Sequence, residues 1–396
     1  MNPVWPTPLE EQLLLASFAG QENAGIALRR AVEAWNRENE PQALPLLPLV
    51  YRRRPAFGGE LIELARRVYL ATWRNNRDRM NRLLEITARF QQEGIRWMAL
   101  KGAALALRHY ADLGLRPMSD VDILVDPANL GHAVELLIHA GYRADEGASP
   151  DAILRQARVR HGWQFFGEPD WNIDLHWRPL SRCWSPEVTE LLWSAAGTVR
   201  FDDHDIVVPS PSDQLFHVCV HGLQWDWARK VRWIADALSI LREPVDWDRV
   251  CRIAGCAQMS FRLERALAFL QERFHAPIPA DVAGRLGRAT SKWEGREYRL
   301  LLKPCPLSVR DSVAWHAYNF RRARPFDERW RNRPAPIGFA EYLVTFLDAP
   351  DWRAFGHKLR PHAALRLDRV LLKNIETGGQ VHSPAKYILL AKTCVG

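Results

Sequence analysis

The sequence predicts an α/β fold of the α+β type, in which a small mixed sheet is flanked by a helical region on each side. Apolar residues recur with the 3.6-residue period of helices over residues 8–93, change to the two-residue period of strands within 94–210, and return to the helical period beyond 245. The chain has 396 residues, of which 47% are hydrophobic and 25% charged, which is enough for two or three cores. We therefore expect a helical N-terminal region (1–93), an α/β core (94–210) and a helical C-terminal region (211–396).

The N-terminal region contains stretches with a clear helical pattern. Residues 8–20 and 23–35 carry apolar residues at helical spacing, and residues 60–92 form a long, arginine-rich amphipathic stretch. A basic helix face can contact RNA, but it is more often a solvated face, so we assign it no site. The arginines concerned are Arg66, Arg67, Arg74, Arg77, Arg79 and Arg82.

The most informative stretch is residues 100–125, LKGAALALRHYADLGLRPMSDVDILV. Its β-branched and aliphatic end predicts a strand over 120–125. Because side chains alternate between the two faces of a strand, Asp120 and Asp122 point the same way, while the aliphatic residues beside them point into a core. Two adjacent carboxylates repel each other at neutral pH unless a cation lies between them. Paired oxygen ligands suit a Mg²⁺ ion that also carries phosphates.

The other half of a phosphate site lies upstream of these carboxylates. Residues 95–100 predict a strand and residues 102–110 a helix, so Gly102 would bring backbone N–H groups and a helix N-terminus close to an anion. Lys101 and Arg116 are the nearby cations. Together with the paired carboxylates, these residues predict a site for a metal-bound triphosphate.

A third carboxylate follows in the remainder of the core. Residues 162–177 predict a hairpin turned at 168–170, with Asp174 on its second strand. His176 shares the face of Asp174 and could orient that carboxylate, touch a substrate or serve as a structural partner, whereas Trp177 lies on the opposite face, in the core. The other expected elements are a helix over 127–140 closed by Gly141, a strand at 142–144, a helix over 151–160 and a two-stranded turn over 198–208.

A strand, a glycine at a helix start and Asp-hydrophobic-Asp on the next strand together resemble the polymerase-β-like nucleotidyltransferase superfamily. Within it, the LKG start, the Arg116 loop, DVDILV and the later IDLHW (173–177) are most similar to the bacterial group usually called uncharacterised nucleotidyltransferases. The likeness is close over 95–177 and extends to 241. One departure is that the superfamily has Gly-Gly or Gly-Ser at the helix start. This chain has Gly102-Ala103, so the serine hydroxyl that commonly helps to hold the terminal phosphates is absent.

The resemblance implies an enzyme that uses Mg²⁺, with Mn²⁺ as the alternative. It would move an NMP from an NTP, expected to be ATP, to an acceptor hydroxyl or similar group and release pyrophosphate. It also implies that Asp120 and Asp122 bind both metal ions, while Asp174 binds the catalytic ion and helps to deprotonate the acceptor. The implied nucleotide-binding residues are Lys101, Gly102, Ala103, Arg116 and Ser119.

Three functions remain compatible with these residues. The first is nucleotidyl transfer to a small molecule, a peptide or a protein. The second is the same chemistry on tRNA, as in nucleotidyltransferase toxins, which also tend to have a KGG-like start before Asp-x-Asp. The third is a catalytically silent nucleotide sensor, suggested by Ala103 in the place of serine. The presence of Asp174 argues against a sensor, which would not need it.

A new helix is expected after the core. Residues 210–213 (SPSD) offer a capping box with proline at the first helical position. His217 and His221 are spaced for zinc, but no third ligand is evident, so a packing or pocket role is favoured. In the resembling group a helical segment with His, Trp and Asp follows the core, and it could line the substrate pocket or form an interdomain hydrogen-bond network. Here those residues are His221, Trp225 or Trp227, and Asp236.

The charge and composition bound the choice of partners. A formal net charge of +8 favours a polyanionic ligand such as a nucleotide or RNA. Residues 321–333 interleave arginines with Phe326 and Trp330, which could bind phosphates and stack bases, although an exposed, partly paired loop is the favoured interpretation. We thus expect an NTP and an unidentified acceptor as partners, with nucleic acid possible but not favoured.

The sequence also bears on the cellular compartment. The six cysteines are scattered without a CxxC pair, as expected for reduced thiols. The first residues lack a basic and apolar leader, and no later segment is long enough to span a bilayer. We therefore expect a cytoplasmic protein with no membrane partner.

Overall fold

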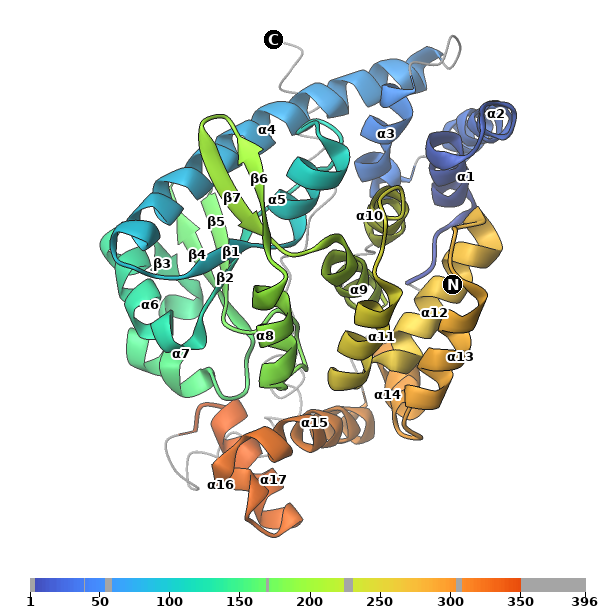
Figure 1. Cartoon of the computed structure of the whole chain (residues 1–396). Coiled ribbons are helices and arrows are strands. Elements are labelled where there is room, and N and C mark those ends of the chain that lie inside the picture. The colour runs from blue at the N-terminus through green and yellow to red at the C-terminus, as the bar shows by residue number, and fades with distance from the viewer. Residues whose placement is uncertain are drawn as a thin grey trace.

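The computed structural model describes residues 4–38, 40–53, 59–168, 171–223, 231–303 and 308–349. A five-stranded mixed sheet lies among helices, with further helices before and after it in the chain (Figure 1), which confirms the predicted fold class. The strand order is β1-β2-β5-β4-β3, in which β2 and β5 run parallel and the other neighbours antiparallel. These strands are β1 Trp97–Ala99, β2 Val121–Val125, β3 Arg143–Ala144, β4 Gly162–Gly167 and β5 Trp171–His176.

The predicted N-terminal helices are confirmed, and η1 and α3 are additional to them. The elements are α1 Pro8–Phe18, α2 Gln21–Glu38, η1 Pro41–Leu46, α3 Leu47–Arg52 and α4 Gly59–Gln92. A capping box starts α1, because the Thr7 hydroxyl accepts from the Glu10 backbone while the Glu10 carboxylate accepts from the Thr7 backbone. On α4, as expected for a solvated face, several arginines form surface ion pairs, namely Arg66–Glu63, Arg77–Asp202 and Arg82–Glu85.

The segments between the strands also follow the predicted pattern. They contain α5 Lys101–Leu105, η2 Ala106–Tyr110, η3 Pro127–Asn129, α6 Leu130–His139, η4 Asp145–Gly147 and α7 Pro150–Gln156. Gly141 ends the α6 segment with a φ of +89°, a conformation that favours glycine. The hairpin of β4 and β5 is confirmed, while residues 169 and 170 of its predicted turn lie outside the described residues.

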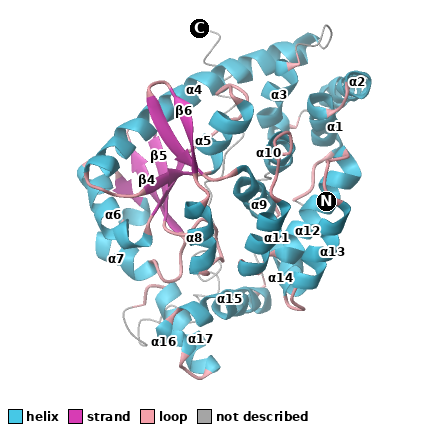
Figure 2. Cartoon of the chain, in the orientation of Figure 1, coloured by secondary structure: helices cyan, strands magenta, loops and turns pink. Residues whose placement is uncertain are grey.

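The end of the α/β region contains one helix that was not predicted. This is α8 Pro186–Ser194, which precedes an antiparallel ribbon of β6 Gly197–Phe201 and β7 His204–Val208. The ribbon confirms the predicted two-stranded turn, but it forms a second sheet beside β1 instead of continuing the first. In Figure 2 the strands gather in one part of the molecule with helices around them.

Helices make up the described part of the chain beyond residue 210, as expected. Ser210 accepts a hydrogen bond from the Asp213 backbone and so caps the first of them. They are α9 Pro211–Gly222, α10 Arg232–Ile240, α11 Trp247–Cys256, α12 Ser260–Phe274, α13 Ala280–Ala289, α14 Glu294–Leu301, α15 Val309–Ala323, η5 Arg324–Phe326, α16 Glu328–Arg331 and α17 Ala335–Phe346. In the described residues, none of the helices has both the length and the apolar character that a membrane crossing requires.

The segment 321–333 is helical and not the loop that was expected, although most of it is exposed as expected, including Phe326 at 48%. It comprises the end of α15, then η5 and α16, and its second aromatic residue, Trp330, is 1% exposed in a hydrophobic cluster with α15 and α17. Arg322 is also buried and forms a two-point ion pair with Glu297, at 2.8 and 2.6 Å. Trp330 and Arg322 are therefore part of the fold and do not present a surface for nucleic-acid bases.

The two faces of the main sheet have different roles. Ile123 of β2 and Leu175 of β5 point into a core that they share with α4 and α6. Asp122 and Asp174 precede them by one residue, so their side chains leave the sheet on the other face. The hydrophobic core thus fixes the orientation of both carboxylates.

Candidate functional site

Two buried carboxylates meet where β2 and β5 run side by side. Asp122 and Asp174 are direct partners in the parallel register, and their residues are 4% and 7% exposed. The structure therefore brings together two of the three predicted aspartates, on one face of the sheet. Two buried negative charges at neighbouring positions require compensating positive charge.

Lys101 supplies part of that charge from the start of α5. Its Nζ lies 2.5 Å from Asp122 Oδ1 and 3.6 Å from Asp174 Oδ2. Burial opposes the charged form, but the two carboxylates outweigh it and raise the pKa of Lys101, so the side chain stays an ammonium. Its backbone has a φ of +40°, which is unfavourable for a lysine and is found mainly where the surroundings enforce it.

His176 supplies the second cationic contact. Its Nε2 lies 3.0 Å from Asp174 Oδ2 and 3.1 Å from Asp122 Oδ1, so this nitrogen carries the proton that both carboxylates accept. Burial lowers the pKa of His176, but Asp174 and then the hydrogen bonds raise it above its usual value. The ring packs on Gly162 of β4, where a Cβ would lie 2.9 Å from Nδ1. A role in orienting Asp174, one of the predicted alternatives, fits this geometry.

The two cations act on the acidity of the carboxylates. Burial raises the pKa of Asp122, but Lys101 and His176 together hold it well below its usual range. In the same way, burial is outweighed at Asp174, mainly by His176 and then Lys101, and its pKa is lowered. Both groups are therefore carboxylates at neutral pH and able to bind a divalent cation.

Asp120, the third predicted aspartate, lies at the edge of this cluster. It precedes β2, is half-buried, and accepts a hydrogen bond from the Ser119 hydroxyl at 3.0 Å. Burial and repulsion from Asp122 and Asp174 raise its pKa. Among the described residues, the potential ligand atoms that come within 4.8 Å of one another belong to Asp122, Asp174 and His176. His176 thus joins Asp122 and Asp174 in this closest group, and metal binding by Asp120 stays a prediction.

The predicted phosphate residues have definite packing partners. A Cβ on Gly102 would lie 2.8 Å from the Met118 side chain and 3.0 Å from Arg116 Nη1, so glycine is needed here for close packing. Arg116 is not a free cation, because its Nε and Nη2 each donate to Asp236 at 3.0 Å. Ala103 is fully buried.

The pairing of Arg116 with Asp236 fits one of the two roles considered for the segment after the core, an interdomain hydrogen-bond network. Asp236 of α10 also accepts from the Tyr110 hydroxyl at 2.8 Å, so it belongs to a hydrogen-bond network between the core and the following helices. The ring of His221 lies 5.9 Å from that of His217. Trp225 and Trp227 lie outside the described residues.

Two further histidines border the site. His217 is buried, and its Nε2 has no hydrogen-bond partner among the described residues. Burial and then Lys101 lower its pKa to about 3, so it is neutral. The ring of His161, which precedes β4, lies 5.3 Å from that of His176. His161 was not predicted as a site residue, although pairing of the hairpin strands alone would have placed it near His176.

A buried carboxylate pair on adjacent parallel strands, with a lysine and a glycine at the neighbouring helix start, is typical of enzymes that transfer phosphorus groups with the help of divalent cations. The chain belongs to a family of nucleotidyltransferases described as uncharacterised, whose sequence model matches residues 43–275. The match covers more than half of the chain and extends beyond the predicted core on both sides. Searches of curated proteins and of solved structures gave no significant match.

Proposed function

We propose that the protein transfers an NMP from an NTP, with ATP as the expected donor, to an acceptor and releases pyrophosphate in a Mg²⁺-dependent reaction. The observation that carries the proposal is the register pair of Asp122 and Asp174, buried on one face and neutralised by Lys101 and His176 together. A fold alone does not specify a reaction. A pair of ionised carboxylates beside Lys101, at the start of α5, restricts the possible reactions to those that involve phosphate groups or metal ions.

The residues present fit a divalent cation. Asp122 and Asp174 offer hard oxygen ligands, and Asp120 lies close enough to feel their charge. Oxygen ligands suit Mg²⁺, and Mn²⁺ accepts the same kind of ligand. When bound, such an ion would stabilise negative charge on the phosphate oxygens. Lys101 and the ion would compete for the same oxygen, Oδ1 of Asp122.

The side chains have separable roles in the proposed transfer. The acceptor oxygen attacks the α-phosphorus, the bond to the bridging oxygen of pyrophosphate breaks, and the acceptor proton passes to Asp174. His176 holds the Asp174 carboxylate in place through its Nε2 proton. Lys101 and the backbone at Gly102 are the groups proposed to hold the phosphates, with Arg116 beside them in its pair with Asp236, and Ser119 orients Asp120.

The acceptor is proposed to be a small molecule, a peptide or a protein. The basic helix and the arginine segment at 321–333 were the arguments that kept tRNA as an alternative, and burial of Trp330 and Arg322 weakens the second of them. On the described surface, the pairs formed by the arginines of α4 give no separate support for RNA.

The proposal is tested by incubating purified protein with each labelled NTP, Mg²⁺ and a cell extract divided into RNA, protein and small-molecule fractions. Pyrophosphate release and transfer of label to one fraction are expected, and both should be lost in Asp122→Asn. Transfer to the RNA fraction would select the tRNA alternative. Binding of Mg-NTP without release in any fraction would select the nucleotide sensor.

A further inference from the structure

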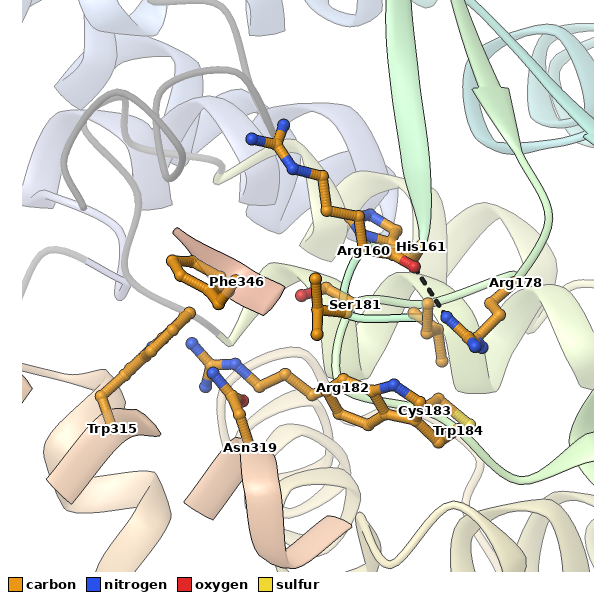
Figure 3. Close-up of a pocket in the computed structure, with 12 residues that line it drawn as sticks. Arg160, His161, Arg178, Ser181, Arg182, Cys183, Trp184, Trp315, Asn319 and Phe346 are labelled. Carbon is orange, nitrogen blue, oxygen red and sulfur yellow. Dashed lines mark hydrogen bonds between the residues drawn. The ribbon is translucent and has the colours of Figure 1, made fainter. Parts of the chain in front are cut away.

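A small pocket lies between the sheet and the last described helices. Its lining comes from the loop before β4, from the loop after β5, and from α15 and α17 (Figure 3). The volume of about 40 Å³ exceeds the roughly 10–15 Å³ that one water molecule requires. It suits a group of a few heavy atoms, such as a carboxylate or a phosphate, and is too small for a nucleoside.

The pocket carries positive charge that the fold does not neutralise. Arg182 contacts the Trp315 ring at 4.9 Å, but its guanidinium makes no hydrogen bond or ion pair with the described residues, and its Nε is buried without a partner. Arg178 donates to the backbone carbonyls of Ala157 and Arg160 and likewise has no carboxylate partner there. Both arginines are half-buried, and a buried N–H group without an acceptor, as at Arg182 Nε, is costly and calls for an explanation.

The nearest carboxylate does not supply the missing partner. Glu297 lies close enough to influence Arg182, but both of its oxygens already accept from Arg322, and Arg262 lies 4.0 Å away. Burial, together with Arg262 and Arg322, lowers the pKa of Arg182 to about 9. His316 adds no charge, because burial and Arg182 lower its pKa to about 3. Arg182, Arg262 and Arg322 thus all lie near Glu297, and Arg182 is left without a carboxylate partner of its own among the described residues.

Two independent features support a ligand site here. Asn319 of α15 lines the same pocket, is 3% exposed, and has its Oδ1 buried without a partner among the described residues. Arg182 has a φ of +64°, a backbone conformation that is unfavourable for arginine and that concentrates at functional positions. A ligand with an oxyanion for Arg182 and a donor group for Asn319 would satisfy both side chains.

Along the sheet, this pocket and the proposed phosphate residues lie on opposite sides of the carboxylates. Lys101 and Gly102 follow β1, Asp122 lies on β2, Asp174 and His176 on β5, and β4 comes next. His161, just before β4, lines the pocket, and its ring is 5.3 Å from that of His176. A molecule anchored in the pocket therefore approaches Asp174 from the side opposite to the donor nucleotide.

From this arrangement we infer that the pocket binds an oxyanion group, phosphate or carboxylate, of the acceptor substrate. The acceptor role rests on the proposed function, whereas the binding of an oxyanion does not. Arg182 is the main anchor, because its planar guanidinium can donate two parallel hydrogen bonds to such a group. The acceptor is accordingly an anionic molecule, with its reactive group directed past His161 toward Asp174.

The test measures thermal unfolding at constant ionic strength with rising inorganic phosphate, and separately with acetate, against chloride. In the wild type, Tm should rise saturably, and more with phosphate, which also offers a donor to Asn319. In Arg182→Met, the phosphate concentration that gives half of the rise in Tm should increase at least tenfold. Its Tm in chloride should equal or exceed that of the wild type, because the substitution removes an uncompensated cation. The matched control is Arg158→Met, which lies in the same region but pairs with Asp327 at 3.0 Å and does not line the pocket.

A second variant keeps the test decisive if Arg182→Met does not fold. Asn319→Asp introduces a carboxylate into the pocket, so it should remove the phosphate response without lowering Tm in chloride. A wild-type protein without a saturable response, or either variant with a full response, would overturn the inference.

Calorimetric titration with Mg-NTP separates this inference from the proposed function. Arg182→Met should keep wild-type Mg-NTP affinity, and loss of that affinity would assign the pocket to the donor nucleotide and refute the acceptor role. A wild type that binds phosphate through Arg182 but binds no Mg-NTP would overturn the proposed function and the acceptor role together, and would leave the oxyanion site standing.

Discussion

Replacing Lys101 by glutamine tests whether the site is built around a cation. The ammonium lies 2.5 Å from Asp122 Oδ1 and 3.6 Å from Asp174 Oδ2. With an effective dielectric constant of about 20, these contacts correspond to roughly 7 and 5 kcal/mol of attraction before desolvation is counted. The desolvation penalty offsets several kcal/mol of this, and removal of one partner of a buried pair costs about 3–5 kcal/mol. With about 2.1 cal/mol/K of unfolding entropy per residue, we expect Lys101→Gln to lower Tm by roughly 4–6 °C.

A divalent cation should offset part of this loss, because the two carboxylates would then be free of their ammonium competitor. With Mg²⁺ or Mn²⁺ at about a hundred times its dissociation constant, the stabilisation is about 2.7 kcal/mol. The assay is differential scanning calorimetry with and without the metal. The matched control is Lys303→Gln, which breaks an exposed pair with Asp311 at 2.6 Å and should cost at most about 1 kcal/mol. The reasoning fails if Lys101→Gln is no less stable than this control, or if the metal stabilises the variant less than it stabilises the wild type.

Three further predictions follow from the same contacts. Asp174→Asn should keep near wild-type Mg-NTP affinity while pyrophosphate release falls at least about a hundredfold, whereas Asp122→Asn should weaken both. Unchanged pyrophosphate release in Asp174→Asn would exclude Asp174 as the proton acceptor. Gly102→Val should lower stability by about 1–3 kcal/mol and reduce NTP affinity in calorimetry, because its side chain would meet Met118 and Arg116; wild-type values for both would place the phosphates elsewhere. Burial raises the pKa of Glu297, but the buried arginines outweigh it and lower this pKa to about 2. The contribution of Glu297 to stability is therefore present above about pH 4.5 and is lost as the pH falls toward 2. Glu297→Gln should make the free energy of unfolding fall less steeply over this acidic range, and an unchanged pH dependence would contradict the assignment.

The strand pattern was sufficient to predict the orientation of the carboxylates. Alternation about Ile123 and Leu175 fixes the face of Asp122 and Asp174, and the structure adds that these two are direct neighbours. The unpredicted helix α8 also had a local signal, because Ser185-Pro186-Glu187 resembles a helix start. Local sequence therefore contained most of the fold.

The partners of charged side chains could not be predicted in the same way. Arg116 was assigned to phosphate from its position in the motif, but its carboxylate partner Asp236 comes 120 residues later. Likewise, Trp330 belongs to an arginine-rich segment that is polar on average, and only its packing against α17 shows that it is buried. Such pairings depend on tertiary contacts between distant segments, for which a single sequence carries no periodic signal.

The loop that leads into β2 shows why the site needs more than the α/β core. From α4, Asn76 donates to the carbonyl oxygens of Leu113 at 2.6 Å and Arg116 at 2.8 Å. From α10, Asp236 binds the Arg116 side chain, so the loop is held from both sides. Because this loop packs on Gly102 and precedes Asp120, its position determines both the proposed phosphate residues and the edge of the carboxylate cluster. The proposed division into 1–93, 94–210 and 211–396 therefore describes regions that build one site together, in agreement with a family match that spans residues from all three.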